Sequence, residues 1–312
     1  MTIDVLRYDP AQRDAWHRLL SRAKNGLFLF DRDYMDYHAE RFADFSAIAL
    51  VDGKPALLCP ASIDPDKAEA FSHKGLTFGG FVASPDLRSG VVIDAVNAML
   101  NAMRQWGATR LAVRLVPPSM CQVPAGEIEF ALGQRGFAVT GRDLCSQISL
   151  NRPSALSKNK MRDVTRALKL GVEIADCPIA DIYPLLEQVL FDRHAAKPVH
   201  SLDELMLLQS RFPDHIVARS ARLGQAVVAG LVLYRYGNVS HTQYLASGED
   251  GRQSNALDLL IADTLECERA RGVAILSLGT SMEGASINHG LMWQKESFGA
   301  RSEVFMTMTG DL

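Results

Sequence analysis

Runs of hydrophobic residues, separated by turns that contain glycine, predict a similar order of strands and helices in the two halves of the chain. For the first half we expect strands at residues 47–51, 55–63 and up to 81, a helix at 88–107, a strand at 111–115, and a short helix that ends at 136. For the second half we expect strands at residues 216–221, 226–236 and 239–246, a helix at 254–272, a strand at 273–278, and a helix that ends near 300. Trp16, Leu19 and Leu20 are expected on the core face of an earlier helix.

Matching glycines support a duplication. Gly53 and Gly224, Gly107 and Gly272, and Gly136 and Gly299 are separated by 171, 165 and 163 residues. A nearly constant separation indicates a repeated domain, and two repeats are too few for a solenoid. The proline and small polar residues at 151–154 are typical of a linker. We therefore predict two α/β domains in tandem, at residues 1–150 and 151–312.

Composition narrows the class of protein. The chain has 312 residues, of which 47% are hydrophobic and 22% charged, with a net charge of −3. This balance argues against general DNA or RNA binding, which needs a surplus of cations. The five cysteines form no CxxC or Cys/His cluster, so reduced thiols and no metal site are expected. The sequence shows neither a leader peptide nor an apolar run near 20 residues, so we expect a cytoplasmic protein without membrane insertion.

A basic stripe is predicted on a helix at residues 157–170. Four cations fall within roughly 80° of one another on this helix: Lys158, Arg162, Arg166 and Lys169. Three apolar residues share another face, which we expect to pack against the domain: Met161, Val164 and Leu168. The stripe could attract an anionic substrate such as a nucleotide diphosphate, or it could be an ordinary solvated face.

The junction between the strand at 239–246 and the following helix could bind an anion. Gly248 and Gly251 allow positive φ or a close backbone approach, and Ser254 or Asn255 could cap the helix. A helix start suits a pyrophosphate, and Arg252 could add a charged contact. Two nearby carboxylates count against this hypothesis, and a loop before a well-capped helix would explain the same residues. Neither GxxxxGK[ST] nor GxGxxG occurs.

Polar residues interrupt an expected core strand. His241 and Gln243 alternate with Thr242 and Tyr244, so each pair faces one side of the sheet. Such groups either bind a ligand or bond to one another. The rigid loop at 197–201 carries His200, and it could be a lid or a helix start capped by Ser201.

The densest set of polar residues follows the strand at 273–278, at the position where open α/β sheets place ligands. Lys295 could neutralise a phosphate or a developing oxyanion. Glu283 and Glu296 are candidate bases, although surface ion pairing would also explain Lys295 and Glu296. Asn288 lies between them in the sequence and could contact a substrate.

At these residues the chain resembles a known group. The segments FLFDRDYM (28–35), HKGLTFGG (73–80), KPVHS (197–201), HTQYLAS (241–247) and QKESFGAR (294–301) resemble tandem GNAT-like proteins of the Fem type. They are most similar to the acetyltransferase-like proteins of polysaccharide and nucleotide-sugar gene clusters. The resemblance implies two GNAT-like domains, each with a mixed, mostly antiparallel sheet flanked by helices. It also implies that Lys295, which precedes Phe298-Gly299, contacts the acceptor and the reacting carbonyl.

The resemblance implies transfer of an acyl group, such as acetyl, from acyl-CoA to an amine or hydroxyl of a sugar or nucleotide-sugar. The coenzyme A loop of single-domain relatives, Arg/Gln-x-x-Gly-x-Gly/Ala, corresponds here to residues 251–256, which lack its second glycine. The predicted catalytic residues are Lys295, Glu283, His241 and Glu296. The predicted cofactor contacts are Tyr244, Ala246, Gly251, Arg252, Ser254 and Asn255, and the predicted substrate contacts are His200, Gln243, Asn288 and Arg162.

Two other functions stay open. One is a Fem-type aminoacyl transfer from charged tRNA to a cell-wall precursor, which the acidic pI near 6.2 and the lack of a long helical insertion disfavour. The other is a binding protein that kept the fold without activity. A homodimer is compatible with the sequence.

Overall fold

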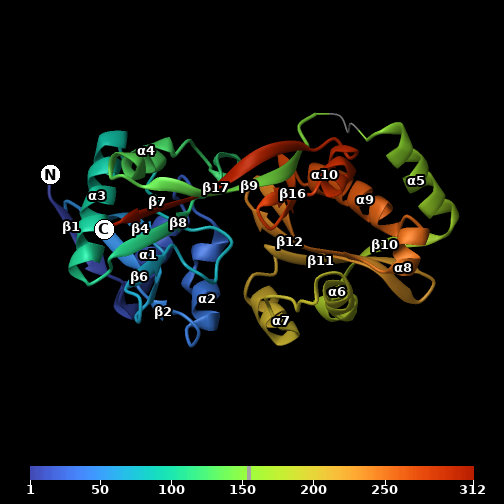
Figure 1. Cartoon of the computed structure of the whole chain (residues 1–312), viewed down its shortest axis with the longest axis horizontal. Helices are drawn as coiled ribbons and strands as arrows, with labels where there is room; N and C mark the ends of the chain where they lie inside the picture. Colours follow the sequence, from blue (N-terminus) through green and yellow to red (C-terminus); the bar gives the residue numbers. More distant parts are fainter. Residues whose placement is uncertain (153–155) are drawn as a thin grey trace. The chain divides into compact units, whose positions relative to one another are not determined.

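The computed structural model describes residues 1–152 and 156–312, so residues 153 and 154 of the predicted linker at 151–154 lie outside the described residues. The chain forms two compact units, one of Met1–Asp143 with Val304–Leu312 and one of Leu144–Glu303. Two long strands, β9 (Ala138–Ser149) and β17 (Arg301–Asp311), carry the chain from one unit to the other (Figure 1). The last nine residues therefore belong to the first unit.

Unit 1 combines an antiparallel sheet with a second group of strands. The first sheet has the order β1 (Ile3–Arg7), β3 (Ala47–Val51), β4 (Lys54–Cys59), β7 (Val82–Ala83). The second group places β17 beside β8 (Arg110–Arg114), followed by β6 (Glu69–Phe71), β5 (Ser62–Asp64) and β2 (Ala43–Asp44). Its longer helices are α1 (Arg13–Leu20), α3 (Ser89–Gln105) and α4 (Gly126–Gln134), with the short α2 (Arg32–Met35).

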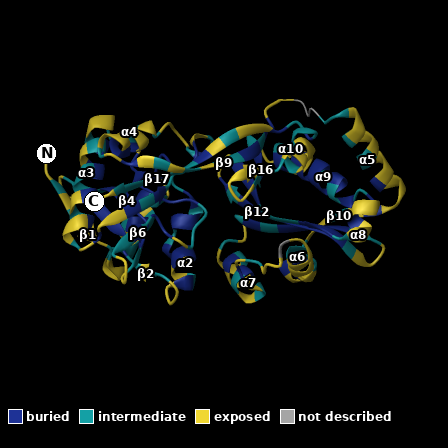
Figure 2. Ribbon diagram, viewed as in Figure 1, coloured by how far each residue is buried: buried dark blue, intermediate teal, exposed yellow. Residues whose placement is uncertain are grey.

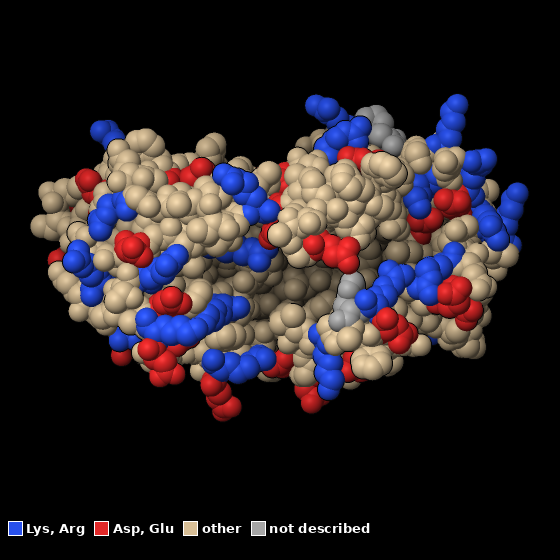
Figure 3. All heavy atoms as spheres, in the orientation of Figure 1, with Lys and Arg blue, Asp and Glu red and all other residues tan. Residues whose placement is uncertain are grey.

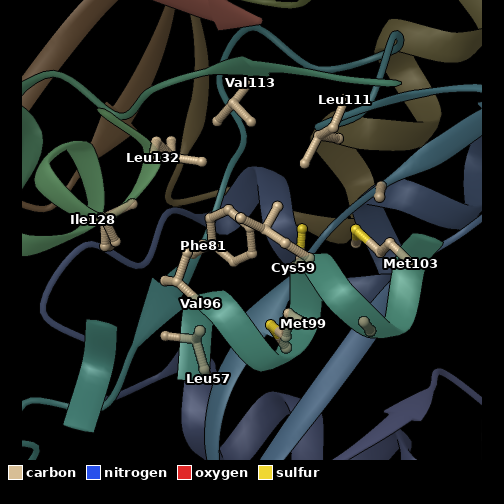
Figure 4. Close-up of a cluster of buried hydrophobic side chains, with 14 of the residues drawn as sticks. Leu57, Cys59, Phe81, Val96, Met99, Met103, Leu111, Val113, Ile128 and Leu132 are labelled. Atoms are coloured by element: carbon tan, nitrogen blue, oxygen red, sulfur yellow. The ribbon is translucent and has the colours of Figure 1, made fainter. Parts of the chain in front are cut away.

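The core of unit 1 lies between α3, α4 and the strands. Figure 4 shows Val96, Met99 and Met103 of α3 in one cluster with Leu57 and Phe81, and all five are fully buried or nearly so. These positions repeat every three or four residues, as expected for one face of a helix. In α1, Trp16 and Leu19 are buried as predicted, and the Trp16 indole N–H donates to the Phe30 carbonyl at 2.7 Å.

Unit 2 contains one mixed sheet. Its order is β10 (Val172–Cys177), β11 (Ile216–Leu223), β12 (Ala226–Tyr236), β13 (Val239–Ser247), β14 (Ile275–Thr280), β9. Only the pair β13–β14 is parallel among these neighbours. The helices α6 (Ile179–His194) and α7 (Leu202–Arg211) lie on one side of this sheet, and α9 (Ala256–Ala270) and α10 (His289–Glu296) lie on the other (Figure 1).

Smaller elements of unit 2 complete the surroundings of the sheet. Helix α5 (Lys158–Lys169) packs on α9, the single-turn helix α8 (Glu249–Gln253) precedes α9, and β15 (Met282–Glu283) and β16 (Ser286–Ile287) form a small hairpin before α10. The helices turn their buried sides toward the sheets and their exposed sides outward (Figure 2).

The predicted order of elements is confirmed for most of both halves, and three local predictions are wrong. Residues 76–81 do not form a strand, because only Val82–Ala83 pair with β4. Met161 and Leu168 are 50% and 59% exposed, since Ala167 and Val164 provide the packing face of α5 instead.

Neither Ser254 nor Asn255 caps α9 with its side chain. The Ser254 hydroxyl donates to the Asp250 carbonyl at 2.6 Å, and Asn255 adopts a left-handed conformation with φ of +55°. By contrast, Ser201 does cap α7, through a capping box with Glu204.

Within the part of the chain that the structure describes, no helix combines the length and apolar character needed to cross a bilayer.

Candidate functional site

A cavity opens in unit 2 where the parallel strands β13 and β14 separate. The two strands pair from Val239–Ile275 to His241–Ser277 and no further. Beyond this point a cavity of about 310 Å³ is lined by Leu245 and Ser247 of β13 and Leu278 of β14. Ligands of α/β proteins commonly bind beyond the carboxyl ends of neighbouring strands. The cavity is therefore the candidate site in this unit.

Positive charge dominates the wall of this cavity. Lys160 of α5, Arg193 of α6, Arg252 of α8 and Lys295 of α10 line it, together with a single carboxylate, Asp258 of α9. Lys160, which is partly buried, and the buried Asp258 form an ion pair, with Nζ 2.7 Å from Oδ1. Arg252 pairs with Glu249 outside the cavity wall, and the described ion pairs include neither Arg193 nor Lys295. This excess of positive charge favours an anionic ligand.

Lys295 is buried, and its surroundings lower its pKa. The side chain is only 6% exposed, and Nζ donates to the carbonyls of Gly279 at 3.1 Å and Thr280 at 2.5 Å. Burial disfavours the charged form and lowers the Lys295 pKa from 10.5 to about 8. Such a pKa is typical of functional lysines.

His241 lies beside Gly279, one of the two residues whose carbonyls accept a hydrogen bond from Lys295. Its ring shares a 2.9 Å hydrogen bond between Nδ1 and the Ser277 hydroxyl, and the side chain is 7% exposed. A Cβ placed on Gly279 would come within 3.6 Å of His241 Cε1, so the ring lies next to Gly279. The Gly279 carbonyl also accepts from Lys295, so Gly279 lies next to both predicted catalytic residues, but His241 itself is not part of the cavity wall.

Tyr244, His200 and Gln243 form a neighbouring polar group. The Tyr244 hydroxyl lies 2.7 Å from His200 Nδ1, and burial raises the Tyr244 pKa to about 12. Gln243 is the extra residue of a β-bulge, since Val232 pairs with Tyr244 while Leu233 pairs with Thr242. The Gln243 Oε1 atom is buried without a hydrogen-bond partner among the described atoms. None of these three side chains lines the cavity.

The predicted cofactor loop forms helix α8. A Cβ on Gly251 would lie 2.1 Å from the Val228 carbonyl oxygen, so only glycine fits at this position. The N–H groups of Arg252, Ser254 and Asn255 all donate to carbonyls within the segment. The Arg252 guanidinium donates to the Ser247 carbonyl at 3.0 Å and to Glu249 at 2.5 Å. Contact to an anion in the cavity must then come mainly from side chains.

Only some of the predicted cofactor contacts line the cavity. Gly251, Arg252 and Asn255 line it, whereas the buried Ser254 does not. Ala246 is a buried strand residue opposite Gly230 of β12.

Four predicted site residues lie apart from the cavity. Glu283 is exposed on the β15–β16 hairpin and accepts a 3.2 Å bond from Asn288, which also caps α10. Glu296 is half-buried at the end of α10. Arg162 is exposed on α5 and donates to Asn159. None of the four is part of the cavity wall.

Sequence reasoning missed Lys160, Arg193, Asp258 and Ser247 as site residues. Asp258 offered a signal, because it is a lone carboxylate in the apolar start of α9 (ALDLLIA), and a buried carboxylate needs a partner. The Ser247 hydroxyl is buried, lines the cavity and has no hydrogen-bond partner among the described atoms. No feature of the sequence indicated that Arg193 would line the cavity.

Unit 1 has a cavity of a different character. It measures about 350 Å³ and is lined mainly by apolar residues and prolines, with Glu129 as its only charged side chain. No lysine, arginine or histidine belongs to the lining as described, so the charge pattern needed for an anionic ligand is found in unit 2.

The residues His17, Asp31 and Asp33 place ligand atoms within 4.8 Å of one another, but ordinary contacts account for them. Asp31 caps α2 and lies 3.1 Å from His17, and Asp33 pairs with Arg13.

No family model matches the chain, and no curated protein sequence is similar to it. Solved structures do show its fold. FemX has a TM-score of 0.73 at 12% identity, over 99% of this chain and 97% of its own. A tandem GNAT protein from the clavulanic acid biosynthesis pathway has a TM-score of 0.57 at 12% identity, over 99% and 98%. L-PGS from Bacillus licheniformis has a TM-score of 0.56 at 12% identity, over 97% and 92%. The chain thus has the tandem GNAT-like fold of the Fem type, as the sequence predicted.

Proposed function

We propose that the protein is an acyltransferase that moves an acyl group, such as acetyl, from acyl-CoA to an amine or hydroxyl of a sugar or nucleotide-sugar. The observation that carries this proposal is the cationic cavity at the ends of β13 and β14, with the buried Lys295 in its wall. The similarity of the fold to a tandem GNAT protein from the clavulanic acid biosynthesis pathway supports the same activity. The proposal that the acceptor is a sugar rests only on the resemblance of the sequence to proteins of polysaccharide and nucleotide-sugar gene clusters.

The transfer needs no covalent enzyme intermediate. The acceptor nitrogen or oxygen attacks the thioester carbonyl, and the carbonyl oxygen becomes an oxyanion. When the carbonyl re-forms, the C–S bond breaks, the acyl group stays on the acceptor, and the coenzyme leaves as a thiolate that takes up a proton. The acceptor loses one proton to a base. The protein must therefore hold the two substrates together, stabilise the oxyanion and accept that proton.

Each of these tasks has a candidate residue. Arg193 and Arg252 would contact the phosphates of the donor, since both line the cavity and carry charge. The Lys295 ammonium would stabilise the oxyanion. His241 is our candidate base, because its ring lies next to Gly279, whose carbonyl accepts from Lys295. Glu283 is a weaker candidate, since it is exposed and hydrogen-bonded to Asn288.

One observation favours a second candidate, the Fem-type transfer of an aminoacyl group from tRNA. Helix α8 uses its own carbonyls for the N–H groups of Arg252, Ser254 and Asn255, so only the N–H groups of its first turn are left as backbone donors to a pyrophosphate. Glu249 and Asp250 occupy its first turn and repel phosphate. The match to FemX over 99% of the chain is consistent with this alternative.

The donor and acceptor that turnover requires distinguish acyl transfer from aminoacyl transfer and from binding without catalysis. Release of free thiol from acetyl-CoA should depend on an amino or hydroxyl sugar acceptor, and Lys295→Met should lower kcat by about 100-fold or more if the lysine stabilises the oxyanion. Lys54→Met removes an exposed lysine of unit 1 outside the cavity wall and should leave the rate unchanged. Binding of acetyl-CoA without turnover on any acceptor would indicate a non-catalytic protein, and transfer from charged tRNA alone would indicate the Fem-type activity.

A further inference from the structure

Helix α5 presents an outer surface that the proposed transfer does not use. Lys158, Arg162, Arg166 and Lys169 are all exposed on it, and the described contacts pair none of these four side chains with a carboxylate. In Figure 3, Lys and Arg side chains gather at the end of the molecule where Figure 1 places α5. The helix is about 18 Å long, so its cations form a band rather than a point.

Apolar side chains lie directly beside this band. Met161 and Leu168 are 50% and 59% exposed, and both fall within about 80° of Lys158 around the helix axis. At the end of the helix, Leu170 is 48% exposed. The interior side is occupied by Val164 and the fully buried Ala167, with the Lys160–Asp258 pair reaching α9. The exposed methionine and leucine therefore do not contribute to the packing of α5.

Cations far outnumber carboxylates on this surface. Between Lys158 and Leu170 the only acidic residue is Asp163, which lies about 60° from Arg166 around the helix and 3.9 Å from Lys160. The whole chain carries a net charge of −3, so this local excess of cations is not a property of the overall composition. A partner for α5 must then be anionic and must also accept apolar side chains.

We propose that α5 is an interfacial helix by which the protein binds reversibly to membrane surfaces rich in anionic lipids. Lipid headgroups would receive the four cations, while Met161 and Leu168 enter the boundary between headgroups and acyl chains. A nucleic acid would match the cations, but its phosphates would leave the exposed methionine and leucine in water. The helix is too short to span a bilayer, so it would lie on the surface. This proposal does not depend on the transferase activity, because it requires no acyl donor.

Vesicle sedimentation tests the proposal with the full chain. The protein should sediment with vesicles of phosphatidylcholine and phosphatidylglycerol (3:1) and not with phosphatidylcholine alone, and binding should fall as salt is raised. Arg162→Glu with Arg166→Glu should weaken binding by about 25-fold or more, because each cation near an anionic surface contributes a factor of about five. Arg88→Glu with Arg104→Glu changes the net charge equally at exposed positions of unit 1 and should have no effect.

A second variant tests the apolar contribution. Met161→Ser with Leu168→Ser should weaken vesicle binding by about tenfold, since these side chains would enter the membrane. Both positions are exposed, so the fold should be unaffected. Failure to bind either vesicle, or equal binding to both, would overturn the proposal. So would unchanged vesicle binding by the serine variant, or binding of bulk tRNA that requires Arg162 and Arg166 without any binding of vesicles.

Discussion

The Lys295 ammonium is held inside unit 2 by two backbone carbonyls, and this environment makes a prediction about stability. Its pKa is about 8 in the folded protein and 10.5 in the absence of burial. Between these values the unfolded chain binds more protons than the folded one, so the free energy of unfolding rises with pH in this window. Relative to Lys295→Met, the wild type should gain roughly 2 kcal/mol between pH 7 and pH 9.5.

Urea unfolding of both proteins at several pH values measures this difference. Lys197→Met, at an exposed lysine, should show no such pH dependence relative to the wild type. A constant difference between wild type and Lys295→Met from pH 7 to 9.5 would mean that Lys295 is fully charged in the folded protein and not strongly desolvated.

The close packing of Gly251 leads to a second prediction, which concerns stability and ligand binding. Gly251→Ala would place a Cβ 2.1 Å from the Val228 carbonyl oxygen, so α8 must move away from β12. We expect a loss of about 1–3 kcal/mol in the free energy of unfolding and weaker ligand binding. Gly133→Ala, in α4, meets no atom within 4 Å and should be neutral or stabilise by about 0.5–1 kcal/mol. Equal stability of Gly251→Ala and the wild type would show that the approach of α8 to β12 is not tight.

At this scale the sequence identified single residues better than pairs. Lys295 could be predicted because it lies in the segment QKESFGAR, which resembles a motif with a known position in the fold. The Lys160–Asp258 pair could not, because its partners are 98 positions apart and meet only when α5 packs on α9. His241 was predicted from an unexpected polar group in a strand, but its partner, the Ser277 hydroxyl, was not.

Among the elements, β17 has the clearest role that the sequence did not predict. Its residues alternate without a run of buried apolar side chains, since only Phe305 and Met308 are buried. The pattern is weak because the strand belongs to two units in turn: its first residues lie in unit 2, and residues from Thr307 pair with β8 in unit 1. Repeated helices and hairpins are visible as local patterns, whereas a strand that returns to the first unit is a property of the topology.

Removal of the end of β17 should therefore affect unit 1 selectively. A chain that stops at Glu303 lacks the strand that pairs with β8 and the core residue Met308. Hydrogen exchange should show loss of protection in α3 and β8, while β11 and β12 of unit 2 keep theirs and serve as an internal control. Unchanged protection of β8 would show that unit 1 does not need its last strand.

For the whole molecule, the central claim is that the cationic cavity of unit 2 binds the acyl donor. Net charge gives no hint of this, because the chain is acidic while Arg193, Arg252 and Lys295 converge on one cavity. Those three residues come from three different helices, so only the folded chain brings their charges together.

The most direct test is calorimetric titration of acetyl-CoA into the wild type and into Arg193→Gln with Arg252→Gln. We expect saturable binding to the wild type and at least about tenfold weaker binding to the variant, since each charged hydrogen bond contributes about 1.5 kcal/mol or more. The pair Arg88→Gln with Arg104→Gln, at exposed positions of unit 1, should bind as the wild type does. Absence of binding to the wild type, or equal binding by the Arg193/Arg252 variant, would contradict the assignment of this cavity to the acyl donor.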